Sequence, residues 1–104
     1  MKPTTAPAYT NVAQQRLLQL VDLLAGHELQ GLAPIAIAKA LACAPSVVTR
    51  DMANLQAAGW AQRTPDGGNW RLSPHVVQIS LRHASAIRAG RQNLNDVEQR
   101  YSRA

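Results

Sequence analysis

Two short helical segments joined by only three residues constrain the fold of this chain more than any other feature of its sequence. Pro34 suits the first turn of a helix that runs to about residue 42, because its missing N–H has no helical partner there. Pro45 restarts the chain, and the Ser46 hydroxyl is the expected cap of a second helix that Gly59 ends. Helices joined by so short a turn cross at a steep angle, so the second projects from its scaffold. The pattern predicts a helix-turn-helix.

The second of these helices, residues 46–59, has two chemically different faces. Apolar side chains at i, i+4 and i+7 form a seam that can pack on a small core: Val48, Met52 and Leu55. The opposite face is predicted to carry four side chains that can address base edges in a DNA major groove: Val47, Arg50, Asp51 and Asn54. The sequence therefore favours a recognition helix, although any amphipathic surface helix also has a polar face.

The flanking segments complete a recognisable order of elements. Asn11 is a good cap for a helix over residues 12–25, and Leu32 could add one edge residue to a small sheet. Residues 60–63 and 70–73 are extended and enclose the turn-rich residues 64–69, which predicts a β-hairpin. Its inner face is expected to bury Trp60, Trp70 and Leu72, and its outer face to carry Arg63, Asn69 and Arg71.

The C-terminal third is also helical in pattern. Pro74 opens a helix to about Ala89, Gly90 ends or interrupts it, and Asn95 begins a possible short fifth helix. The fold class is mainly α with a small β-hairpin: a winged helix-turn-helix with a three-helix core, a two-stranded wing and one or two C-terminal helices. The expected organisation is a disordered tail over 1–10, a winged helix domain over 11–90 and a helical extension over 91–104.

Charge and composition narrow the class of function. The 104 residues carry 11 Lys and Arg against 6 Asp and Glu, a net charge of +5, and this excess of cations favours nucleic acid as the partner. Together with the recognition helix, it predicts binding to double-stranded DNA. A lone Cys43 is expected to be a small core residue in a cytoplasmic protein, with no membrane segment. His27, His75 and His83 lack the spacing of metal ligands, so we expect no metal, no cofactor and no enzymatic activity.

From about Val12 to Ser80 the chain resembles the N-terminal DNA-binding domain of isocitrate lyase regulator (IclR) type transcription factors. Three runs carry the resemblance: GLAPIAIAKAL, SVVTRDMANLQAAGW and RTPDGGNWRLSPHVVQIS. It implies sequence-selective binding to duplex DNA by a homodimer and transcriptional regulation. Ser46 and Thr49 would contact phosphates or bases, Arg50 would be the principal reader, and Arg63 and Arg71 would face phosphates from the wing. The full expected set of DNA contacts also includes Val47, Asn54 and Asn69.

The chain departs from that family in four residues and in length. Ala42 replaces a Gly of the turn, at a cost on the order of 1 kcal/mol if the position is left-handed. Val47 replaces a hydroxyl residue, Asp51 replaces an apolar one and could restrain Arg50 or repel phosphate, and Asn69 replaces a basic wing residue. The family's effector-binding domain is missing, so no small-molecule effector is expected.

Two questions stay open from the sequence. The apolar residues of the C-terminal third either pair two copies of the chain or close the core of one copy: Val76, Leu81, Ile87, Leu94 and Val97. The leading function is a DNA-binding transcriptional regulator. The alternative is a winged helix protein-protein interaction module whose basic surface binds an acidic partner.

Overall fold

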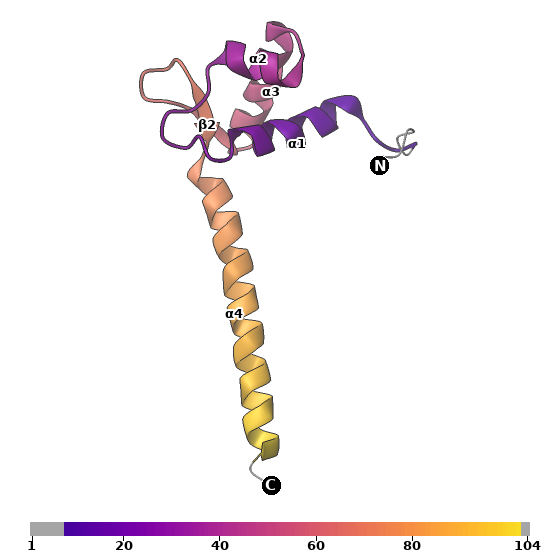
Figure 1. Ribbon diagram of the computed structural model, residues 1–104, viewed down its shortest axis with the longest axis vertical. Helices are drawn as coiled ribbons and strands as arrows, with labels where there is room; N and C mark the ends of the chain where they lie inside the picture. Colours follow the sequence, from indigo (N-terminus) through magenta and orange to yellow (C-terminus); the bar gives the residue numbers. More distant parts are fainter. Residues whose placement is uncertain (1–7, 103–104) are drawn as a thin grey trace. The chain divides into compact units, whose positions relative to one another are not determined.

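The computed structural model describes residues 8–102, and residues 1–7 of the expected tail lie outside this range (Figure 1). The chain divides into two units, Met1–Ser73 and Pro74–Ala104. We call them the N-terminal unit and the C-terminal unit. Within the described residues, the N-terminal unit holds three helices and a two-stranded hairpin, and the C-terminal unit holds one helix. The predicted mainly helical winged helix-turn-helix is confirmed.

The first helix, α1 (Val12–Leu24), begins where the sequence predicted. Asn11 caps it, because its side-chain oxygen accepts a hydrogen bond from the Gln14 N–H at 3.1 Å. Leu20 and Leu24 lie on one face of α1 and are fully buried. They form the centre of an aliphatic core with Ile37, Val48 and Met52, which are buried to a similar degree.

The helix-turn-helix consists of α2 (Pro34–Leu41) and α3 (Pro45–Ala57). Ala42 lies in the left-handed region, with φ 51° and ψ 48°. The Cys43 N–H donates to the Ala38 carbonyl at 3.1 Å and the Ala42 N–H donates to the Lys39 carbonyl at 3.3 Å, which is the Schellman arrangement that usually holds Gly. Ser46 is not the cap of α3: the helix begins at Pro45, with Ala44 as a cap that makes no side-chain hydrogen bond.

The wing is an antiparallel hairpin of β1 (Ala61–Arg63) and β2 (Trp70–Leu72). Leu32 joins it as the sequence suggested, through an isolated bridge to Trp70. Two backbone hydrogen bonds make this bridge, at 2.8 and 2.9 Å. Trp70 and Leu72 are buried and Trp60 is half-buried, so the predicted inner face of the wing is largely confirmed.

The C-terminal unit is one continuous helix, α4 (Pro74–Ser102). The predicted end or interruption at Gly90 and the separate fifth helix are therefore wrong. A single Gly costs a helix only about 1 kcal/mol, which does not break a run of this length. None of the described residues of α4 is buried. The apolar residues of its second half are exposed, as is Leu81 nearer its start, while Val76 is half-buried.

Candidate nucleic-acid interface

One face of α3 presents polar side chains that are free of the core. Ser46, Thr49, Arg50 and Asn54 are exposed, whereas Val47 is half-buried. The Thr49 hydroxyl donates to the Pro45 carbonyl at 3.2 Å, and the Asn54 amide donates to the Arg50 carbonyl at 3.0 Å. Both bonds run four residues back along the helix. They hold these two side chains against α3 and leave one side-chain oxygen of each available as an acceptor.

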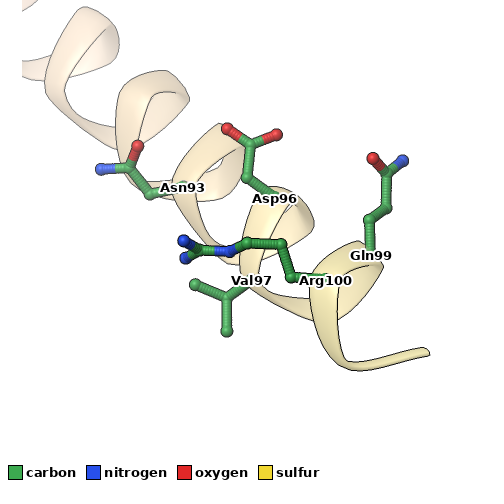
Figure 2. Close-up of a pocket in the computed structure, with 5 residues that line it drawn as sticks. All are labelled: Asn93, Asp96, Val97, Gln99 and Arg100. Atoms are coloured by element: carbon green, nitrogen blue, oxygen red, sulfur yellow. The ribbon is translucent and has the colours of Figure 1, made fainter. Parts of the chain in front are cut away.

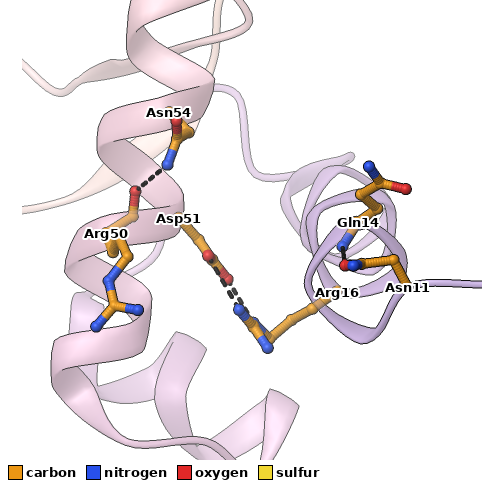
Figure 3. Close-up of polar contacts among 6 residues, drawn as sticks. All are labelled: Asn11, Gln14, Arg16, Arg50, Asp51 and Asn54. Carbon is orange, nitrogen blue, oxygen red and sulfur yellow. Dashed lines mark hydrogen bonds and ion pairs between the residues drawn. The ribbon is translucent and has the colours of Figure 1, made fainter.

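The guanidinium of Arg50 differs from those of the other arginines in the N-terminal unit. Within residues 8–102, no hydrogen bond, ion pair or ring contact is found for its side chain. Figure 3 shows it extending along α3, apart from the neighbouring ion pair. All five of its N–H donors are therefore available to a ligand, and a guanidinium can donate to two acceptors of one guanine at once.

Asp51 does not belong to this face, and the prediction that it shares the face of Arg50 is wrong. The Asp51 side chain is only 6% exposed, and its carboxylate forms an ion pair with Arg16 of α1 (Figure 3). Arg16 Nε lies 2.5 Å from Oδ2, and Nη2 lies 3.2 Å from Oδ1. The position explains the error: residue 51 follows Val48 by three and precedes Leu55 by four, so it lies in the apolar seam.

The partner of Asp51 was also missed, although the sequence carried a signal for it. Arg16 precedes the buried Leu20 and Leu24 by four and eight residues, so it lies on the core face of α1. One charge of each sign on two facing apolar seams indicates a pair, since an unpaired charge there would be costly. The hydrogen bond to Asp51 raises the pKa of the Arg16 guanidinium, and partial desolvation opposes this rise.

The two wing arginines are held along the hairpin. The Arg63 guanidinium lies 4.4 Å from the centre of the Trp70 ring, and its Nη1 donates to the Gly67 carbonyl at 2.8 Å. Arg71 Nε and Nη2 lie 3.0 and 3.2 Å from the side-chain oxygen of Gln62, in the amide orientation that satisfies both groups. Each arginine keeps further N–H donors for a ligand. The stacking fixes Arg63 before any ligand arrives.

Asn69 has a structural role at the base of the wing turn. Its side-chain amide donates to the Gln30 carbonyl at 2.9 Å, and its backbone N–H donates to the Thr64 hydroxyl at 3.2 Å. Thr64 is buried and also bonds Asp66, whose pKa is lowered chiefly by that hydrogen bond and then by the Gly68 N–H. The side chain that was expected to reach DNA thus ties the wing to the loop before α2.

A cation outside the predicted set is Lys39. It is exposed on the last turn of α2, directly before the turn that leads into α3. In helix-turn-helix proteins the first helix of the pair crosses the phosphate backbone, so a cation there is placed to meet phosphate. Its position on the helix before the turn can be read from the sequence.

The described residues give no sign of two other kinds of site. Among residues 8–102, no group of three or more His, Cys, Asp or Glu side chains is placed to hold a metal ion. None of the helices in that range has both the length and the apolar character needed to cross a lipid bilayer.

Comparison with known proteins identifies structures of similar fold. No protein-family model and no curated protein sequence matches this chain. Among solved structures, the chain is similar to the Zα domain of cyprinid herpesvirus 3 ORF112, whose structure describes its binding mode to Z-DNA. The TM-score is 0.52 and the identity is 21%. The chain is also similar to the Zα domain of Carassius auratus PKZ in complex with Z-DNA, with a TM-score of 0.51 and 22% identity. Each match covers 60% of this chain and 98% of the other. These likenesses show the winged helix fold.

Proposed function

We propose that this protein binds double-stranded DNA through the exposed face of α3 and acts as a transcriptional regulator without enzymatic activity. The observation that carries the proposal is the guanidinium of Arg50, which has no partner within residues 8–102 and lies on the projecting helix of a helix-turn-helix. Ser46 and Thr49 lie one turn before or beside it and supply hydroxyls for phosphates or base edges. Asn54 lies one turn after it and supplies an amide oxygen.

The ion pair of the half-buried Arg16 with the buried Asp51 supports the same assignment. An acidic side chain on a recognition helix would repel phosphate if it faced outward. Here the carboxylate points into the protein and meets a positive charge. The charged and polar side chains that remain on the α3 surface are therefore cationic or neutral, which favours a polyanion as the ligand.

The wing contributes contacts to the sugar-phosphate backbone in this proposal. Arg63 and Arg71 hold guanidinium groups at fixed places beside the hairpin, and each retains N–H donors. Lys39 adds a third cation from α2. The wing turn, residues 64–69, contains no Lys or Arg, so it offers no basic side chain of its own for insertion into the minor groove. We infer that the wing contacts phosphates.

The form of the DNA and of the protein belongs to the proposal as well. We propose that the protein reads right-handed DNA in the major groove, because the guanidinium of Arg50 with flanking hydroxyls suits the base edges there. We also propose that it binds as a homodimer and needs no small-molecule effector. The order of the runs from residue 31 to residue 80 favours an IclR-type regulator among winged helix proteins. The two solved neighbours are complexes with Z-DNA, so a left-handed duplex is the informative competitor.

The test is selection of bound duplexes from a random pool, followed by titration of the selected and an unrelated duplex at two salt concentrations. Replacing Arg50 by Ala should cost about 1 to 3 kcal/mol on the selected duplex and relax the sequence preference at one position. Arg50→Lys keeps the positive charge but cannot donate to two acceptors of one base in the geometry of a guanidinium. Compared with Arg50→Ala, it should therefore restore affinity for unrelated DNA without restoring the preference for the selected duplex. Equal loss on both duplexes after Arg50→Ala would refute its role as the reader.

Two further results would redirect the proposal. Preferential binding of a duplex held in the left-handed form would replace major-groove reading by recognition of DNA shape. Absence of binding to any duplex at low salt would favour the alternative, a module that binds an acidic protein.

A further inference from the structure

The second half of α4 exposes a row of large apolar side chains. Leu94 is 65% exposed, Tyr101 79%, Ile87 49% and Val97 39%. An isolated helix in water gains little from intrinsic helix propensity, and most helical stability in proteins comes from packing of an apolar face. A row of this kind therefore calls for a partner surface.

The spacing of this row is that of a coiled coil. Ile87, Leu94 and Tyr101 follow one another at intervals of seven residues, and Gly90 and Val97 come three residues after the first two. These are the a and d positions of a heptad pattern. Figure 2 shows Asn93, Val97 and Arg100 on one side of the helix, while Asp96 and Gln99 project elsewhere. The heptad pattern thus gives one apolar stripe, which has the polar residues Asn93 and Arg100 beside it at Val97. We call Gly90, Leu94, Val97 and Tyr101 the α4 seam.

We propose that the α4 seam pairs with the α4 seam of a second copy of this chain in antiparallel orientation. Antiparallel pairing sets a positions against d positions, so Leu94 of each copy meets Val97 of the other. In the same register Tyr101 of each copy lies over Gly90 of the other. The large Tyr101 side chain then fills the space that Gly90 leaves open, because glycine has no side chain.

Charge complementarity supports the same register. Arg91 and Glu98 both occupy e positions, and antiparallel pairing brings e positions together. Arg91 of each copy then faces Glu98 of the other, and the two-fold symmetry gives this pair twice. Parallel pairing would instead place Gly90 against Gly90 and Arg91 against Ala86, with a gap in the seam and no opposite charge. The self-complementary pattern thus identifies a second copy as the partner, and it does not depend on DNA binding.

Charge reversal tests the proposal directly, on the full-length protein without DNA. Sedimentation equilibrium should give a dimer for the unmodified chain. Arg91→Glu and Glu98→Arg should each raise its dissociation constant about tenfold, because an attractive pair at two symmetric places becomes repulsive. The double variant Arg91→Glu with Glu98→Arg should return the dissociation constant to near its original value. Within one helix the two residues are seven apart and do not meet, so the rescue reports contact between copies.

A second pair of variants separates loss of packing from a change of charge alone. Leu94→Asp places a carboxylate in the seam and should weaken the dimer by about a hundredfold or more. Gln99→Asp adds the same charge to the same part of α4 away from the seam, and it should leave the dimer intact. A monomer at every soluble concentration would overturn the proposal. Failure of the double charge reversal to rescue would overturn the antiparallel register.

Discussion

Replacement of Ala42 by Gly should stabilise the N-terminal unit. Ala42 adopts φ 51° and ψ 48° and is exposed, so the change relieves backbone strain and removes no packing. A non-glycine residue in this region costs about 1 to 2 kcal/mol. The greater conformational freedom of Gly in the unfolded chain offsets about 0.4 to 1 kcal/mol of this stabilisation. The net expectation is a stabilisation of about 0.5 to 1 kcal/mol, or a rise of roughly 2 to 8 °C in Tm for a unit of this size.

Tryptophan fluorescence is a suitable probe for this measurement, since both tryptophans of the chain, Trp60 and Trp70, lie in the N-terminal unit. The control is Ala53→Gly, an exposed position in the middle of α3, which should lower the free energy of unfolding by about 1 kcal/mol. The two substitutions are chemically identical and should act in opposite directions. If Ala42→Gly destabilises as Ala53→Gly does, the left-handed turn between α2 and α3 is refuted.

Two further changes test the loop and the wing. Gly31→Ala should destabilise the protein by about 2 kcal/mol or more, because Gly31 has φ +70° and an added Cβ would lie 2.6 Å from the Trp70 carbonyl oxygen. Gly26 has φ +94° but open space around it, so Gly26→Ala should cost less stability in the same thermal unfolding experiment. Asp66→Asn should destabilise at neutral pH, and the difference in stability should shrink as the pH falls below the unfolded pKa of the carboxyl. The hydrogen bond from Thr64 lowers the pKa of Asp66 in the folded state, so its contribution is present above the unfolded pKa and is lost as the pH falls through the folded one; a constant difference between the two proteins across that range would contradict this.

Most of the fold follows from local rules that a sequence displays. The Asn11 cap, the proline at the start of α2 and the short turn after it each depend on a few neighbouring residues, and the structure has all three. The sequence also indicated that Leu32 adds one edge residue to the sheet, and the structure shows that its partner is Trp70. The end of α4 was not, since Gly90 lowers helix stability without setting a boundary.

The candidate site was harder to predict, because the roles of its residues depend on other elements. Asp51 was assigned to the outer face of α3, and only the position of α1 shows that Arg16 holds it inside. Asn69 was assigned to DNA, yet the loop at Gln30 takes up its amide. In both cases the polar side chain has a partner more than 30 residues away in sequence, so only the Asp51 assignment is wrong and the DNA contact of Asn69 stays a prediction. Arg50, which has no such partner among residues 8–102, was placed outward from its spacing alone.

The bridge between Leu32 and Trp70 ties the loop before α2 to the second wing strand, which lies 38 residues further along the chain. A hairpin of three-residue strands would open readily on its own. Here it cannot detach without breaking the backbone bonds that also anchor that loop. The Trp70 amide should therefore exchange with solvent deuterium at a rate set by unfolding of the whole N-terminal unit, while the Gly67 and Gly68 amides at the turn exchange through local opening.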